Sequence, residues 1–392
     1  MVKRIIIDPG WSWDKKYTFS QGVRVDDLLF IAGLGPIDPA GNLVGKGDIK
    51  AQAKQVFENM GIILKCTGAT FSDVAHLNIF VTDITKLPEI REIRTEYFKR
   101  DFPASTAVEA GNLALEEMML EIDAVAILGE VGSQKKVIDP GWDWDDNFSF
   151  SQAVDVGDYI FVSGQVAIAP DGTLMGQGDV KAQTRQVFEN LKTVLKSGGV
   201  GFEDVVKLTC YFTDISALSK TGDLWVQSFK RDYPTSTAVQ VRHLALDGLM
   251  VEIEAMAVKN RARANKAVVD PGWPWDDKFL FSPAIKAGDL IFVSGQGAID
   301  IQGRFVGQGD IKVQTRQALD NIETILKRAG SSLGDLVKIN LFFTNIAHLP
   351  DFHEVRAEYL KRAFPASRGI GVSALAFKDM MVEIEAIARV GG

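Results

Sequence analysis

A triple internal repeat constrains the fold of this 392-residue chain more than any other feature. The peptide D-P-G-W-x-W-D begins at Asp8, Asp139 and Asp270, which are spaced by 131 residues. The same spacing relates three glycines and three glutamates further along, namely Gly33, Gly164, Gly295, Glu121, Glu252 and Glu383. Solenoid units are only about 20–50 residues long, so each copy is long enough to be a domain. We expect domains at 1–131, 132–262 and 263–392.

The composition is that of a soluble globular protein. Hydrophobic residues make up 46% of the chain and charged residues 24%, as in ordinary domains. The net charge of −8 argues against a nucleic-acid partner or an anionic membrane surface. No apolar run approaches the roughly 20 residues of a membrane span. The two cysteines, Cys66 and Cys210, show no pairing signature, so we expect a cytoplasmic protein without a membrane partner.

The second copy illustrates the secondary structure expected of each domain. Alternation of apolar and polar residues over 148–156, followed by the apolar run 159–168, predicts a β-hairpin. Asp179 is a good N-cap for a helix that reaches about Lys196 and stops at Gly198. The remaining elements are expected to be a strand at 204–215, a helix at 217–230 and a closing strand pair at 236–246 and 249–258.

This β-β-α-β-α-β-β order predicts an α/β (α+β) domain in which two helices cover one face of a mixed sheet. The other face of the sheet is also apolar and needs cover. Three such sheets can pack around a pseudo-three-fold axis, because closed rotational symmetry is the usual arrangement of identical units. The sheets would then lie inside and the helices outside.

Two short motifs recur in this order within the repeats. S-G-Q follows the second strand at 163–165 and 294–296, and V-E-I-E-A forms the last strand at 251–255 and 382–386. With these motifs, nearly the whole chain resembles the RidA/YjgF family, three times over. The resemblance implies a chorismate-mutase-like fold and a trimer with clefts between its subunits, here fused into a monomeric pseudo-trimer; further dimerisation is left open. It also implies hydrolysis of enamine or imine acids to keto acids and ammonia without a cofactor.

The resemblance also indicates functional residues. The acidic residue that holds the hydrolytic water corresponds to Glu121, Glu252 and Glu383. The serine of S-G-Q is present as Ser163 and Ser294, whereas the first copy has Ala32. An aromatic residue near the first strand, often Tyr in the family, corresponds to Phe19, Phe150 and Phe281.

The carboxylate-binding arginine of the family is missing. Its positions, two residues after a proline, are occupied by Ser105, Ser236 and Ser367. Arg368 follows one residue later, but adjacent strand residues point to opposite faces. Arg94 and Arg356, equivalent positions on the second helix, are further candidates, because guanidinium binds carboxylates with two hydrogen bonds. The alternative is that these helical arginines lie on the solvated surface.

The Trp-rich turn admits two interpretations. The indole rings could stack on a planar substrate, which we favour for Trp13, Trp144 and Trp275. Alternatively, the first Trp of each turn, at Trp11, Trp142 and Trp273, packs on a neighbouring domain. Neither the four histidines nor the cysteines repeat in register, so no metal site is predicted. The Gly-rich segments before the first helix, such as 176–179, are interpreted as a turn plus N-cap.

These features lead to a functional hypothesis and a rival. The hypothesis is a deaminase of an enamine or imine carboxylic acid, with a 2-aminomuconate-type diacid favoured and a small carboxylate as its only expected partner. Glu252 or Glu383 would act as general base on water. We expect fewer than three working clefts, because Ala32, Trp225 and Arg368 make the copies different. The rival is a non-catalytic protein that binds a small metabolite in the same clefts.

Overall fold

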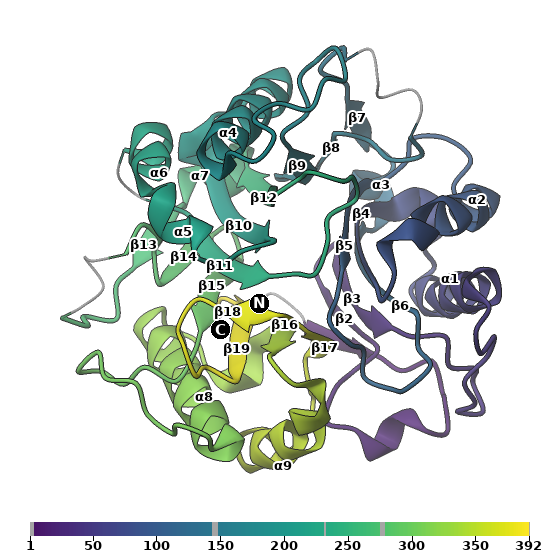
Figure 1. Cartoon of the computed structure of the whole chain (residues 1–392). Helices are drawn as coiled ribbons and strands as arrows, with labels where there is room; N and C mark the ends of the chain where they lie inside the picture. Colours follow the sequence, from purple (N-terminus) through teal and green to yellow (C-terminus); the bar gives the residue numbers. More distant parts are fainter. Residues whose placement is uncertain (1–3, 143–147, 231–232, 275–278, 392) are drawn as a thin grey trace.

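The computed structural model describes residues 4–142, 148–230, 233–274 and 279–391. Three mixed sheets surround a central axis, and the long helices lie at the periphery (Figure 1). This arrangement confirms the predicted fold class, with sheets inside and helices outside. The boundaries proposed for the three domains stay predictions.

Each sheet is built largely from one repeat, and the helices and strands are as follows. The first repeat contains β1 (Arg4–Ile7), β2 (Gly22–Val25), β3 (Leu28–Leu34), α1 (Ile49–Cys66), β4 (Val74–Val81), α2 (Leu87–Tyr97), β5 (Ala104–Glu109), β6 (Leu120–Ile127) and α3 (Gly129–Gly132). The second contains β7 (Lys136–Ile138), β8 (Ala153–Val156), β9 (Tyr159–Val166), α4 (Val180–Ser197), β10 (Val205–Phe212), α5 (Ala217–Lys220), α6 (Gly222–Phe229), β11 (Thr235–Gln240), β12 (Val251–Val258) and α7 (Asn260–Ala264). The third contains β13 (Ala267–Val269), β14 (Ala284–Ala287), β15 (Leu290–Gln296), α8 (Ile311–Arg328), β16 (Leu336–Phe343), α9 (Leu349–Tyr359), β17 (Ala366–Gly371), β18 (Ala374–Leu375) and β19 (Val382–Arg389).

The strand order differs from the prediction in two respects. A short strand that was not predicted precedes each Trp-rich turn, and these strands, β1, β7 and β13, pair antiparallel with the strand after the turn. The expected closing pair is wrong, since β11 pairs in parallel with β10 and β12 pairs with β10 and β9. The helical crossover between β10 and β11 explains this, because parallel neighbours need such a connection. β18 of the third repeat extends the second sheet by pairing with β11.

The long helices begin and end as the sequence predicts. The Asp179 side chain accepts hydrogen bonds from the backbone N–H groups of Lys181 and Ala182, and Gly198 is the C-cap. This confirms the interpretation of the Gly-rich segment as a turn plus N-cap. Predicted helix 217–230 is divided into α5 and α6, with Thr221 between them.

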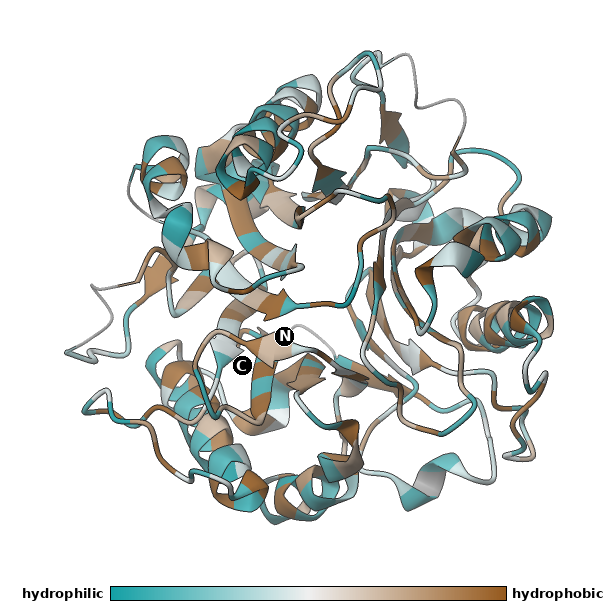
Figure 2. Ribbon diagram, viewed as in Figure 1, coloured by the Kyte–Doolittle hydropathy of each residue, from teal (hydrophilic) through white to brown (hydrophobic). Residues whose placement is uncertain are grey.

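Two kinds of apolar core hold the chain together. An outer core in each repeat lies between the sheet and its helices. Two inner cores combine residues of all three repeats and join the sheets around the axis. In Figure 2 the hydrophobic colour dominates the sheets, and hydrophilic residues gather on the peripheral helices and loops. The inner cores explain why the second face of each sheet is apolar.

Candidate functional site

One strand of each repeat lies beside the second hairpin strand of the next repeat, which carries S-G-Q in β9 and β15 and Ala32-Gly33 in β3. β5 contacts β9, β11 contacts β15, and β17 contacts β3. We call these places cleft 1/2, cleft 2/3 and cleft 3/1, and cavities are described for the first two. The first number gives the repeat that contributes the helix α2, α6 or α9. The second gives the repeat that contributes the glutamate, which is Glu252, Glu383 or Glu121 respectively.

Glu252 stands at the inner end of cleft 1/2. Its side chain lies against Gly164, and it accepts a hydrogen bond from the backbone N–H of Ala107 in the first repeat. Its Oε2 is buried and has no hydrogen-bond partner among the described residues. Burial, followed by repulsion from Glu254, raises the pKa of Glu252 to about 8. A carboxyl group in this state can both donate and accept a proton near neutral pH.

The other two glutamates occupy matching positions. Burial and then Glu385 raise the pKa of Glu383 to about 8, and its Oε2 also lacks a partner in the described part of the chain. Burial raises the pKa of Glu121 to about 7, and the nearby guanidinium of Arg368 opposes that rise. All three predicted catalytic carboxyls are therefore placed alike, but their neighbours differ.

Cleft 1/2 has a volume of about 330 Å³ and brings four of the predicted positions together, Arg94, Ser105, Phe150 and Glu252. Arg94 reaches into it from α2 and donates hydrogen bonds to Ser105 Oγ (3.3 Å) and to Ser149 Oγ of the second repeat (3.0 Å). Phe150 and Glu252 line the same cavity. The guanidinium thus reaches Ser105, the strand position at which the resemblance places a carboxylate-binding arginine.

The surface interpretation of Arg94 and Arg356 is wrong, since the two side chains are only 2% and 0% exposed. Burial, and then repulsion from Arg91, lowers the pKa of Arg94 to about 9, so it remains cationic at neutral pH. Its Nε is buried without a hydrogen-bond partner among the described residues. Arg91, which also lines the cleft, lies over the ring of Phe148, 4.6 Å from the centroid. Two cations therefore face this cavity.

Cleft 3/1 contains a cation whose hydrogen bonds are made within the protein. Arg356 donates from Nε and Nη2 to Thr18 Oγ1 (2.9 and 2.8 Å) and from Nη1 to Ser367 Oγ (3.1 Å). Its Nη2 also lies 2.8 Å from Nδ1 of His353, whose pKa is lowered to about 3 by burial and then by Arg356. The His353 ring contacts Phe19 of the first repeat.

Cleft 2/3 is larger, about 460 Å³, and has a different lining. Trp225 stands where the other clefts carry Arg94 and Arg356, and Ser236, Phe281 and Glu383 also line it. No Arg, Lys or His is among the described residues of this cleft.

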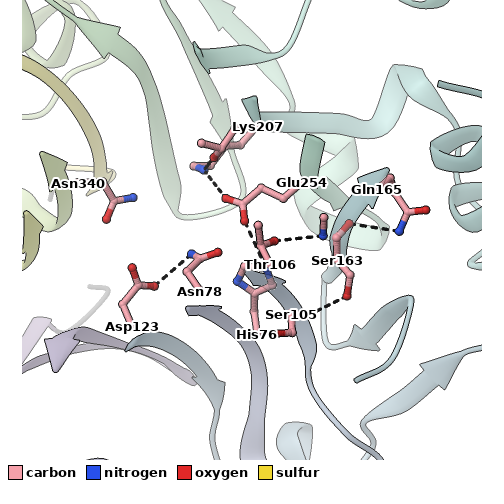
Figure 3. A network of polar contacts seen from close by, with 12 residues as sticks. His76, Asn78, Ser105, Thr106, Asp123, Ser163, Gln165, Lys207, Glu254 and Asn340 are labelled. Carbon is pink, nitrogen blue, oxygen red and sulfur yellow. Dashed lines mark hydrogen bonds and ion pairs between the residues drawn. The ribbon is translucent and has the colours of Figure 1, made fainter. Parts of the chain in front are cut away.

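Ser163 and Ser294, predicted to bind substrate, lie between the repeats and are fully buried. Ser163 Oγ accepts a hydrogen bond from the backbone N–H of Ser105 (2.7 Å) and donates to Ser151 O (2.5 Å), as Figure 3 shows in part. Ser294 makes the equivalent bonds to Ser236 and Ser282. Both hydroxyl groups thus join one repeat to the next, which corrects their predicted role.

Arg368 also differs from its prediction, because it points to the central axis and not into a cleft. Its Nε lies 2.8 Å from Asp123 Oδ2, and its guanidinium stacks on the ring of Phe80 at 4.2 Å. The alternation of strand side chains explains this, since Ser367, one residue earlier, faces the cleft side. We therefore leave Arg368 out of the candidate site.

Arg368 belongs to a buried charged layer that sequence reasoning missed. We use the term axial layer for the following residues, partly drawn in Figure 3 and all buried except Lys207, whose side chain is 13% exposed: His76, Asn78, Asp123, Lys207, Glu254, Lys338, Asn340, Arg368 and Glu385. Lys207 Nζ lies 3.2 Å from Oε1 of Glu385 in the third repeat and 3.6 Å from Oε1 of Glu254 in its own repeat. Ion pairs of this layer therefore link different repeats. The signal was present, because lysines interrupt two otherwise apolar strands at equivalent positions.

The Trp-rich turns serve the outer cores. Gly10 has a φ of +78°, and its N–H donates to Asp8 Oδ1 (2.7 Å), so the turn requires this Asp and Gly. Trp11, Trp142 and Trp273 are buried in the outer core of their own repeats, which corrects the expected packing on a neighbouring domain, and Trp273 also lines cleft 2/3. Trp13 stacks on Trp11 and donates from Nε1 to Asp38 O. Trp144 and Trp275 lie outside the described residues.

The described residues contain neither a metal-binding cluster nor a membrane-spanning helix. No group of three or more His, Cys, Asp or Glu side chains there is arranged to hold a metal ion. In the same part of the chain, every helix is too short or too polar to cross a membrane.

Comparison with known proteins finds the same three-fold repeat. The sequence model of the family described as Endoribonuclease L-PSP matches residues 14–128, 146–259 and 278–390. A RutC family protein of Pyrococcus abyssi is 39% identical over 110 residues, which are 28% of this chain and 86% of that protein. Human 2-iminobutanoate/2-iminopropanoate deaminase is 37% identical over 111 residues, 28% of this chain and 80% of the human protein.

A solved structure covers more of the chain. The crystal structure of a chorismatase shares the fold over 81% of this chain and 93% of its own, with a TM-score of 0.52 and 16% identity. The three family matches together cover most of the sequence. The chain therefore belongs to the Endoribonuclease L-PSP family, also called RidA/YjgF, and carries three tandem copies of its domain.

Proposed function

We propose that the chain is a cofactor-independent hydrolytic deaminase of an enamine or imine carboxylic acid, and that cleft 1/2 is its working site. The observation that carries the proposal is the pairing of Glu252 with Arg94 in one cavity. Both groups are buried and each has an atom without a partner among the described residues, Glu252 Oε2 and Arg94 Nε. Unpaired buried polar atoms are costly, so they are typical of a site that a ligand completes. The name of the human relative supports the same chemistry.

The substrate carboxylate would bind the guanidinium of Arg94, with Ser105 and Ser149 holding that group in place. Arg91 supplies a second cation in the same cleft, which favours a diacid of the 2-aminomuconate type over a monoacid. Phe148 and Phe150 offer flat apolar surfaces to a conjugated chain.

The raised pKa of Glu252 gives the reaction a consistent proton sequence. The protonated carboxyl donates to the enamine Cβ, which yields an iminium ion and a carboxylate. The carboxylate then takes a proton from water as the water oxygen bonds to the imine carbon. The resulting carbinolamine receives that proton on nitrogen, and the C–N bond breaks. The hydroxyl proton returns to the Glu252 carboxylate, which leaves a keto acid and ammonia and restores the protonated carboxyl, so one water is consumed for each ammonia released.

The test is ammonia release from freshly generated 2-aminomuconate and 2-iminobutanoate, with one test variant and two matched control variants. We expect Glu252→Gln to lose at least about 100-fold in rate, since general acid–base groups contribute 10²–10⁴-fold. Glu121→Gln and Glu383→Gln should retain most of the activity. Release from 2-aminomuconate alone would support the diacid, and release from 2-iminobutanoate alone would overturn it. If neither substrate reacts and both bind, the chain is a binding protein, as the rival hypothesis states.

A further inference from the structure

Three equivalent sets of residues surround the three clefts, and one set has lost its polar character. Cleft 1/2 carries Arg91 and Arg94, and cleft 3/1 carries His353 and Arg356 at the same positions. Cleft 2/3 carries Gly222 and Trp225 there. The residue whose hydroxyl group accepts a hydrogen bond from the arginine changes in the same way. It is Ser149 in cleft 1/2 and Thr18 in cleft 3/1, but Leu280 in cleft 2/3.

These replacements have left the cavity open. Cleft 2/3 has a volume of about 460 Å³ even though the large Trp225 side chain lines it. Gly222, at the other replaced position on α6, has no side chain that could fill the cavity. Trp225 packs against Phe188 of the outer core, with ring centroids 5.3 Å apart, so its ring forms a fixed wall of the cleft. Phe281 and Phe377 of the third repeat also line the cavity. An apolar cavity with aromatic walls and few polar groups is typical of a small-molecule site.

Glu383 is the acidic group at the inner end of this cavity, which is also lined by the neutral polar side chains of Ser219, Ser236, Gln296 and Asn321 and by the unpartnered indole N–H of Trp225. Glu383 keeps the placement of its counterparts, and its Oε2 is buried without a hydrogen-bond partner among the described residues. Its pKa of about 8 leaves the carboxyl group mainly protonated at neutral pH, so it can donate one hydrogen bond and accept another. A carboxylate ligand would lose its hydration here without meeting a described cation, which is costly.

We propose that cleft 2/3 is a second ligand site, specific for an uncharged planar molecule with one amide-like or ring N–H group that reaches Glu383. The site differs in ligand class from cleft 1/2, whose arginines select carboxylates. The proposal stands independently of the deaminase activity, because it concerns binding at the other cleft.

Three probes of one shape and different charge test the proposal by titration calorimetry. They are indole-3-acetamide, indole-3-acetate and tryptamine. We expect the full-length protein to bind the neutral amide at one site that is lost in Glu383→Ala. At that site the acetate should bind at least about tenfold more weakly, because its charge would be buried unpaired. Preference for tryptamine would show that Glu383 acts as a carboxylate counter-ion and would overturn the proposal.

Variants separate this cleft from cleft 1/2. Trp225→Arg should weaken the amide at least about tenfold and leave ammonia release at cleft 1/2 unchanged. Since Trp225 also belongs to the outer core, Phe377→Ala provides a second variant on a 40% exposed side chain, and it too should weaken the amide. Arg94→Trp is the matched control at cleft 1/2 and should not affect the amide site. Amide binding unchanged by both Trp225→Arg and Phe377→Ala would contradict the assignment.

Discussion

The carboxylate of Glu252 lies so close to the Cα of Gly164 that a β-carbon at position 164 would collide with it. The same relationship holds between Glu383 and Gly295, and between Glu121 and Gly33. Gly164 does not need a left-handed backbone, so close approach is the reason for glycine in the S-G-Q motif. The glycine and the glutamate, almost 90 residues apart in sequence, form one structural unit.

Replacing this glycine should therefore disable the cleft without touching a catalytic group. We expect Gly164→Ala to push the Glu252 carboxyl out of place and to lower the rate of ammonia release at least about 100-fold, because small displacements of catalytic groups have such effects. Gly33→Ala, the matched variant in cleft 3/1, should retain activity. Equal losses in both variants would contradict the assignment of activity to cleft 1/2 alone.

The two buried arginines offer a second matched comparison. Arg94→Ala should raise KM by about 10²-fold, the loss expected for a charged hydrogen-bonding partner of the substrate. Arg356→Ala should leave KM near the wild-type value, because Arg356 is engaged by Thr18, Ser367 and His353. Steady-state kinetics on the same imine acid compares the KM values of the two variants. A larger increase in KM for Arg356→Ala than for Arg94→Ala would show that cleft 3/1 is the working site.

The raised pKa of Glu252 predicts a pH profile for an enamine substrate. The first step needs the protonated carboxyl, so kcat/KM should fall as pH rises through about 8. The residual rate of Glu252→Gln should lack this inflection. Arg94 loses its charge only near pH 9, so measurements from pH 6 to 8.5 isolate the carboxyl. A rate that increases across this range would contradict the proposed proton donation by Glu252.

The same groups predict how stability depends on pH. A carboxyl whose pKa is raised by folding stabilises the protein fully below its unfolded value of 4.5, and that contribution is lost as pH rises through about 8. We expect the wild-type melting temperature to fall more between pH 5.5 and 8.5 than that of Glu252→Gln/Glu383→Gln. The corresponding difference in the free energy of unfolding should reach about 2–5 kcal/mol. Each site contributes about 1.4 kcal/mol per unit of pKa change, and local relaxation reduces the sum. Parallel curves would show that the two carboxyls titrate normally.

The repeat spacing, the helix caps and the alternation in the strands were sufficient to predict the three-sheet architecture. The parallel neighbour of β10 was missed because apolar patterning does not distinguish adjacent strands from strands separated by a third. Arg94 was predicted as a candidate, but its burial depends on the next repeat, whose Ser149 approaches it across the cleft. Such contacts between copies cannot be read from one copy alone.

The axial layer shows what fusion of three copies permits. Equivalent positions carry His76, Lys207 and Lys338 on β4, β10 and β16, and Thr106, Thr237 and Arg368 on the neighbouring strands β5, β11 and β17. With His76 neutral, because burial lowers its pKa, the cations Lys207, Lys338 and Arg368 balance Asp123, Glu254 and Glu385. Three identical subunits could not place one arginine against one aspartate in this way.

Breaking this balance should cost stability and leave catalysis intact. Arg368→Met removes the cation that lies 2.8 Å from Asp123, and leaving a buried charge unpaired costs about 3–5 kcal/mol. The double variant Asp123→Asn/Arg368→Met should recover part of that loss, because the remaining buried charge is removed as well. Urea unfolding measures both effects, and ammonia release below the unfolding transition should stay at the wild-type rate. If the double variant is no more stable than Arg368→Met, Asp123 is satisfied by Lys338 and Asn78 alone, and the arginine contributes mainly through its packing on Phe80.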